Sequence, residues 1–321
     1  MAGRPRRRHV EPLSGRTWVA LHVIRLISAP TSLGLRPPSA GRVPGCYKAP
    51  EALRKAGMFE LFQEDGASDW GTVAPREYSE EVAPGRIRNQ EQIISFSKSL
   101  STKIHAAVTA GDVPLVIGGD CSVLIAAGLA LKRAGRYGLI HLDGHTDFRH
   151  PGNSDKVASL AGEDLAAAVG MHWGSISDID GLGAYFEPLD ATHAGCRDRD
   201  EHLKEVRAKL GLVLPASEIR KRGVANASKA MLARMEASAI EGFWLHLDLD
   251  ILDPNVLPSV DSPDPGGLST YELTSLLQKL APKAVGAEVT IYDPDLDPTG
   301  EYARLVSVVV HKGLRRLRED A

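Results

Sequence analysis

The chain has 321 residues and a formal net charge of -3, with 43% hydrophobic and 25% charged residues. This composition is that of an ordinary globular protein, and the length suits one large α/β domain. The slight negative charge argues against a nucleic-acid-binding surface, and no apolar run approaches the ~20 residues that span a bilayer. The three cysteines, Cys46, Cys121 and Cys196, form no C-x-x-C pair, so we expect a cytoplasmic protein with reduced thiols.

The first 15 residues are basic and contain proline, but they lack the apolar core of a secretory signal. Their arginines would allow a transit peptide, although the amphipathic helical pattern is missing. We therefore expect residues 1–15 to be a disordered extension and residues 16–321 to form a single domain.

Apolar runs along the remaining chain predict buried strands at 18–26, 113–117, 137–142, 243–247 and 284–289. Periodic or apolar stretches predict helices at 49–56, 90–110, 121–133, 162–170, 201–210, 227–241, 269–280 and 302–317. The polar residues 63–87 read as a surface loop. Strands that alternate with helices predict an α/β fold with one mostly parallel sheet and helices on both faces.

Polar clusters follow four of these strands, where ligands bind in such sheets. The clusters are Gly118-Gly119-Asp120-Cys121-Ser122, Asp143-x-His145-x-Asp147, Asp248-Leu249-Asp250 and Glu288. Alternate residues of an extended chain share one side, so Asp143, His145 and Asp147 can converge. No Lys or Arg stands among them to offset buried carboxylates, which favours a metal site over a salt bridge. Alone, D-x-H-x-D could equally be a solvated turn; four clusters at strand ends indicate a site.

The motifs GGDCS, DGHTD, DLDILDP and AEV, in that order, resemble the arginase, agmatinase and formimidoylglutamase superfamily. The resemblance implies a three-layer α/β/α fold, two divalent metal ions, usually Mn²⁺, and a trimeric or hexameric homo-oligomer. It also implies hydrolysis of a small linear guanidino or amidino compound, in which a water activated by the ions attacks the guanidinium carbon.

Carried over by motif, the resemblance assigns bridging positions between the two ions to Asp143 and Asp248. His145 and Asp250 would complete one ion's shell, and Asp147 and Cys121 the other's. As catalytic residues it implies Asp147, which would accept a hydrogen bond from the activated water, and Glu288, which would pair with the substrate's cationic head. Asp200 would bind the substrate's α-amino end, while Asp253 is expected to brace the turn at Pro254.

The chain departs from the family pattern at Cys121, where the usual residue is histidine. A cysteine at the start of a helix can be a thiolate, and a thiolate could shift the metal preference from Mn²⁺ towards Zn²⁺ or Fe²⁺. The alternative is a small packed residue beside a vacant metal position.

A second departure is the turn Leu160-Ala161-Gly162, which lacks the proton-shuttling histidine of arginases. A better leaving group such as hydroxyguanidine needs less acid catalysis, so hydroxyarginine is an alternative substrate. His150 could replace the missing acid, or it could be an ordinary histidine of a surface turn.

A third departure is Arg149, where arginases place an asparagine. The sequence Asp147-Phe148-Arg149 resembles that of the formimidoylglutamase branch. An arginine at this position can hold a substrate carboxylate bidentately, so it disfavours agmatine, which has no carboxylate. The alternative is an ion pair with Asp264 or another surface acid. A different class of function, a catalytically inactive metal- or ligand-binding family member, also stays open. A histone-deacetylase-like amidohydrolase would need a His-His pair that the sequence lacks.

Overall fold

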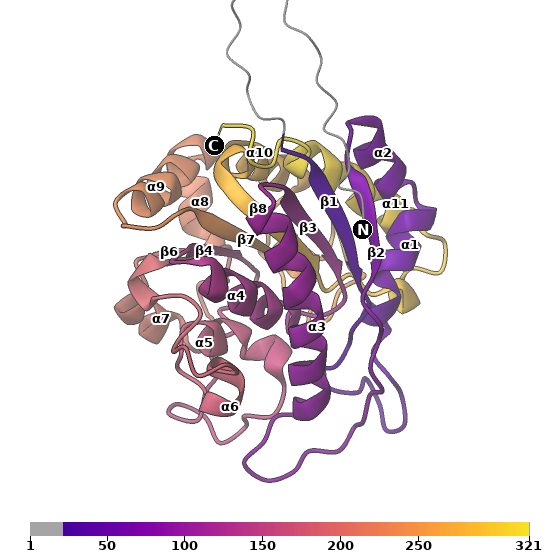
Figure 1. Cartoon of the computed structure of the whole chain (residues 1–321), viewed down its shortest axis with the longest axis vertical. Helices are drawn as coiled ribbons and strands as arrows, with labels where there is room; N and C mark the ends of the chain where they lie inside the picture. Colours follow the sequence, from indigo (N-terminus) through magenta and orange to yellow (C-terminus); the bar gives the residue numbers. More distant parts are fainter. Residues whose placement is uncertain (1–21, 321) are drawn as a thin grey trace, which may run out of the picture.

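The computed structural model describes residues 22–320, so the expectation for residues 1–15 lies outside the described part. Its centre is one eight-stranded sheet in which all neighbouring strands pair in parallel (Figure 1). The strands are β1 (Ile24–Ala29), β2 (Ser68–Thr72), β3 (Val113–Gly118), β4 (Gly138–Leu142), β5 (Ala191–Ala194), β6 (Leu212–Leu214), β7 (Phe243–Asp248) and β8 (Ala284–Thr290). The predicted α/β fold with a parallel sheet is confirmed.

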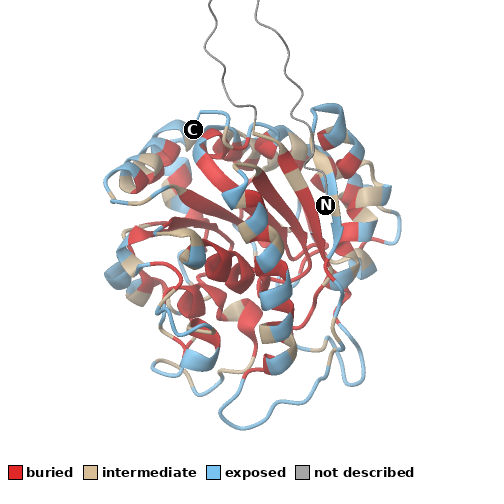
Figure 2. Ribbon diagram, viewed as in Figure 1, coloured by how far each residue is buried: buried red, intermediate tan, exposed pale blue. Residues whose placement is uncertain are grey.

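Helices cover both faces of the sheet and enclose two apolar cores, which makes the three-layer arrangement that the resemblance implied (Figure 2). One core contains residues of α1 (Ala49–Lys55), α2 (Met58–Glu64), α8 (Ala216–Arg222), α9 (Val224–Glu236), α10 (Thr270–Leu280) and α11 (Glu301–Leu314). The other contains residues of α3 (Gln90–Thr109), α4 (Val123–Ala134), α5 (Asp164–Ala168), α6 (Gly174–Ser177) and α7 (Leu203–Lys209). Strand residues alternate between the two cores; Leu115 and Ile117 face one, and Val116 faces the other.

The strand order is β2-β1-β3-β8-β7-β4-β5-β6. The four strands that the polar clusters follow, β3, β8, β7 and β4, are therefore consecutive neighbours at the centre of the sheet. Because parallel strands end at the same edge, this order brings the clusters together although they are far apart in sequence.

The structure corrects several predicted elements. The stretch 63–87, predicted as a loop, contains the end of α2 and the strand β2. The short strands β5 and β6 were not predicted. The helix predicted from Cys121 begins at Val123, so the GGDCS segment is a loop that leads into α4. Among residues 22–320, none of the helices has the length and apolarity that a bilayer span requires.

Candidate metal centre

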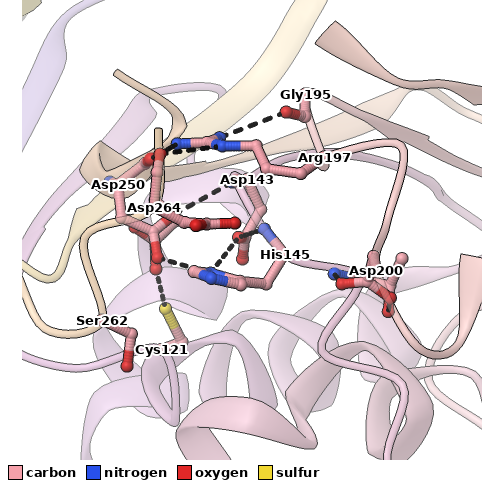
Figure 3. A network of polar contacts seen from close by, with 12 residues as sticks. Cys121, Asp143, His145, Gly195, Arg197, Asp200, Asp250, Ser262 and Asp264 are labelled. Atoms are coloured by element: carbon pink, nitrogen blue, oxygen red, sulfur yellow. Dashed lines mark hydrogen bonds and ion pairs between the residues drawn. The ribbon is translucent and has the colours of Figure 1, made fainter. Parts of the chain in front are cut away.

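Three side chains converge at the ends of β4 and β7: Asp143, His145 and Asp250. One ligand atom from each lies within 4.8 Å of the others. His145 Nδ1 is 2.8 Å from Asp250 Oδ2, and the His145 amide donates to Asp143 Oδ1 at 2.6 Å (Figure 3). We call these residues the outer set. The resemblance implied these three residues around one ion together with Asp248, which is not in this group.

A second group, Cys121, Asp143, His246 and Asp248, also has one ligand atom per residue within 4.8 Å of the others. We call it the inner set; all four side chains are buried. Cys121 Sγ lies 2.9 Å from Asp248 Oδ2, the contact drawn in Figure 3, and 3.1 Å from Thr290 Oγ1. Asp143 belongs to both sets, so two ions bound here would share it.

Asp147, implied as a ligand beside Cys121, belongs to neither set among the described residues. It sits in the left-handed backbone region, with φ of 43°, and lines the cavity described below. Burial, partly offset by the nearby His145, raises the pKa of Asp147 to about 7. The Asp147 carboxyl also has a side-chain hydrogen bond with Asp143, so it lies beside the metal-binding carboxylates as well as at the cavity wall.

The electrostatics of the inner set favour a bound cation. Burial and the surrounding carboxylates raise the pKa of Asp143 and of Asp248 well above the usual aspartate range. Asp143 Oδ2 and His246 Nε2 are buried and have no hydrogen-bond partner in the described chain. The nearby cation Arg197 does not neutralise the carboxylates, because its guanidinium donates to backbone carbonyl oxygens, such as that of Asp250 (Figure 3). Unpartnered oxygen and nitrogen atoms beside a buried thiol fit divalent transition metals.

The expectation that the helix dipole favours a Cys121 thiolate is corrected. Burial, and then the Asp248, Asp164 and Asp143 carboxylates, raise the pKa of the Cys121 thiol well above its usual value. Cys121 also lies two residues before the first residue of α4. The sulfur therefore needs a bound cation before it becomes a thiolate.

A cavity of about 450 Å³ opens onto the outer set. Its wall carries the residues predicted to read the substrate, together with other charged side chains: Arg36, Arg149, Arg197, Arg199, Asp200, Glu201, His202, Asp261 and Asp264. Ala161 also lines it, which places the turn without its histidine beside the cavity.

Arg149 lines the cavity and makes two long ion pairs. Its Nη1 lies 3.9 Å from Glu163 Oε1, and its Nη2 lies 3.4 Å from Glu201 Oε1. The alternative pairing with Asp264 is wrong, because Asp264 pairs with Arg199 instead. The alternative of some surface acid is met by Glu201, whose side chain is 68% exposed. Such loose pairs leave the guanidinium able to turn towards an anion in the cavity.

Asp200 also lines the cavity and organises the segment after the outer set. It accepts hydrogen bonds from Thr146 N at 2.9 Å, Thr146 Oγ1 at 2.6 Å and His202 N at 2.9 Å. Asp253, predicted to brace a turn, does so by accepting from the amides of Asn255 and Gly266.

His150 and Glu288 are not among the residues that line the cavity. His150 is 6% exposed; its Nε2 lies 3.1 Å from Glu205 Oε1, and its Nδ1 accepts from the Gly152 amide. Glu288 is buried on β8, with Oε1 2.7 Å from His246 Nδ1. In the structure, His150 contacts Glu205 and Gly152, and Glu288 contacts His246.

Three buried residues near the metal-binding groups, His246, His141 and Asp164, were not among those predicted from the sequence. His141 and His246 stack with ring centroids 4.4 Å apart, and both face Asp164, whose two oxygens lack hydrogen-bond partners in the described chain. A signal existed for the histidines. Each stands two residues before a predicted ligand aspartate in its strand, and therefore shares its side.

The chain was compared with known proteins. Residues 23–314 match the model of the arginase family. The chain is 29% identical over 271 residues to an arginase of Brevibacillus brevis, covering 81% of this chain and 89% of that one. The solved arginase of Bacillus caldovelox matches with a TM-score of 0.81 and 26% identity over 91% of this chain and 98% of that one. A formimidoylglutamase of Bacillus subtilis, at 21% identity, a TM-score of 0.71 and coverage of 93% and 88%, shares the fold. The protein belongs to the arginase family, hydrolases that act on the C–N bonds of amidines.

Proposed function

We propose that this protein hydrolyses a linear guanidino or amidino compound that carries a carboxylate. The observation that supports this most is the cavity itself, which joins the outer set to a wall containing Arg149 and Asp200. A cationic amidine head fits against the carboxylates of the outer set. A carboxylate tail fits the guanidinium of Arg149, and an α-amino group fits Asp200.

Two divalent ions, with Asp143 and Asp248 as the shared carboxylates, are part of this proposal. When bound, they would supply a water of lowered pKa as the nucleophile. Asp147 then accepts a hydrogen bond from that water and holds its proton, a task that suits a carboxyl group whose pKa lies near 7. We expect Mn²⁺ or, because of Cys121, Zn²⁺ or Fe²⁺.

The leaving amine needs a proton, and Ala161 cannot donate one. We propose that the preferred substrate therefore has a good leaving group, as hydroxyarginine or formimidoylglutamate does. His150, proposed from the sequence as the substitute acid, faces Glu205 rather than the cavity. His202 lines the cavity and is the better placed histidine.

The test is an assay of the metal-reconstituted protein on arginine, hydroxyarginine, formimidoylglutamate, agmatine and guanidinobutyrate. Release of urea, hydroxyurea or formamide is measured. We expect turnover of a substrate with a carboxylate and little turnover of agmatine. Turnover of agmatine alone would contradict the assignment of Arg149.

A second candidate is a catalytically inactive family member that binds a metal or ligand. Cys121 and Ala161, which replace two family histidines, favour it. About two bound ions per chain with turnover of an amidine would exclude it, whereas two bound ions with no turnover of any of the five compounds would support it. A cytoplasmic trimer or hexamer is also part of the proposal; sedimentation at micromolar concentration tests the assembly.

A further inference from the structure

The inner set contains a histidine that the family motifs do not supply. His246 lies on β7, two residues before Asp248, so both side chains emerge on the same side of the strand. Its Nδ1 lies 2.7 Å from Glu288 Oε1, a contact that orients the imidazole ring. Its Nε2 is buried and has no hydrogen-bond partner in the described chain, and a ring nitrogen of His246 groups with ligand atoms of Cys121, Asp143 and Asp248.

This arrangement is the one that metal-binding histidines adopt. A ligating imidazole almost always donates its second N–H to a carboxylate or carbonyl, which orients the ring and raises its basicity. Here Glu288 is that carboxylate. Asp143 Oδ2, the other orphaned atom of the inner set, is equally unsatisfied without a cation.

We propose that His246 is a metal ligand, and that Cys121, Asp143, Asp248 and His246 hold the inner ion, with Glu288 as the residue that positions His246. Binding displaces the thiol proton of Cys121 to solvent, and the Sγ···Oδ2 hydrogen bond to Asp248 becomes two bonds to the ion. Asp147 is then left to the cavity. The inference rests on the metal dependence in the proposed function, but not on any substrate.

The chemistry of this shell differs from that of the outer set. One thiolate, one imidazole and two carboxylates make a four-ligand set that suits Zn²⁺ or Co²⁺, whereas carboxylate-rich sites suit Mn²⁺. The protein would therefore hold one ion with a softer ligand shell and one with a harder shell, linked through the shared carboxylates. Of the inner set only Asp248 lines the cavity, so Cys121 and His246 would hold the inner ion from the side away from the cavity.

His246 also belongs to a second group, with His141 and Asp164. In this group His246 Nε2 lies 3.8 Å from Asp164 Oδ2, and His141 Nε2 lies 3.6 Å from Asp164 Oδ1. One nitrogen serves only one of the two arrangements. We favour the inner set because Asp143 connects it to the outer set, while the Asp164 cluster shares no residue with the outer set. Asp164→Asn therefore distinguishes the two.

The test uses the full-length protein, stripped with a chelator and titrated with Co²⁺. A thiolate on Co²⁺ produces a sulfur-to-metal charge-transfer absorption, and intense visible bands report a four-coordinate ion. We expect both signals in the wild type at about two ions per chain. Cys121→Ser should lose the charge-transfer band, and His246→Gln should lose the strong-affinity four-coordinate ion. Asp147→Asn and Asp164→Asn should keep both signals.

Glu288→Gln tests the positioning role. It should keep the charge-transfer band while the Co²⁺ affinity of the inner site falls by about 10- to 100-fold, the usual effect of losing such a partner. An unchanged affinity would contradict the role of Glu288.

X-ray absorption of the zinc-loaded wild type checks the shell without any variant that could misfold. We expect one sulfur at about 2.3 Å and nitrogen or oxygen at about 2.0–2.1 Å. A shell without sulfur would overturn the inference. Loss of the inner ion in Asp147→Asn with retention in His246→Gln would also overturn it, as would loss in Asp164→Asn. If the shell is observed but no amidine is hydrolysed, only the proposed function fails.

Discussion

Arg149 is the residue on which the choice of substrate depends. It holds only weak ion pairs with Glu163 and Glu201, and its guanidinium lines the cavity. We predict that Arg149→Gln raises KM for a carboxylate-bearing substrate by about 10-fold or more, the scale of one charged hydrogen bond, with a smaller change in kcat. Agmatine, which has no carboxylate, should bind no worse.

Steady-state kinetics on both substrates measures this difference. The matched control is Glu201→Gln, which removes the exposed partner but keeps the guanidinium; it should leave KM unchanged or lower it. An equal loss for both substrates in Arg149→Gln would assign Arg149 to the fold rather than to specificity.

Ala161 is the second informative residue of the cavity wall. We predict that Ala161→His raises turnover of substrates with poor leaving groups, such as arginine, because a positioned general acid typically contributes about 10²–10⁴-fold. Hydroxyarginine, whose leaving group needs less help, should gain less. The ratio of the two kcat values measures the effect, and an equal change in both would argue against a missing acid.

For single residues, the sequence predicted all three members of the outer set and every member of the inner set except His246. Asp143, His145, Asp248 and Asp250 could be found because alternation along an extended chain places them together. Asp147 was grouped with them by the same rule; it lines the cavity and has a side-chain hydrogen bond with Asp143, and its role as a ligand stays a prediction. His246 escaped notice because a histidine inside the apolar run FWLHL looks like a core residue.

Among the elements, α11 depends on a cap that lies outside it in sequence. Asp297 accepts hydrogen bonds from the Tyr292 hydroxyl at 2.7 Å and from the amides of Ala303, at 2.8 Å, and Glu301, at 3.1 Å. Although burial opposes it, these bonds lower the pKa of Asp297. The ionised carboxylate therefore stabilises the start of the helix.

We predict that Asp297→Ala destabilises the protein by about 1–3 kcal/mol at neutral pH, the cost of a lost cap with unsatisfied donors. Because the folded-state pKa is depressed, this stabilisation is present above the unfolded value of about 3.9 and is lost as pH falls through the folded value. Denaturant unfolding at pH 7 and at pH 3 measures it, and the difference from wild type should shrink at pH 3. A constant difference would mean that the charge of Asp297 contributes nothing.

The elements that the sequence predicted well are long and periodic, such as α3, or fully apolar, such as β3. Those it missed give no such signal. β2 reads SDWGT and is largely exposed, while β5 and β6 have only four and three residues. Their place in the sheet is decided by pairing with a neighbouring strand rather than by their own pattern.

For the whole molecule, the unpaired carboxylates predict that metal removal weakens the fold. A chelator should lower Tm, and the loss should be larger at pH 8 than at pH 6. Raising the pH through about 7 ionises Asp147 in the metal-free protein and destabilises it, because burial and nearby carboxylates oppose the charge. A higher pH also strengthens metal binding, because the ligands must lose protons to bind an ion. Thermal unfolding with and without chelator measures this loss of Tm at the two pH values. An equal loss of Tm at pH 6 and pH 8 would contradict the prediction.

The order of the central strands has a practical consequence. Cys121, Asp143, His246 and Asp248 span 127 residues of chain, and only the correct sequence of neighbours β3-β8-β7-β4 brings them within reach of one ion. A proteolytic fragment or a chain with one strand displaced would keep much of its helix content and still lose the site. The spectrum of a cobalt ion bound by Cys121 would then serve as a readout of native topology, more selective than circular dichroism for sorting folded from misassembled protein.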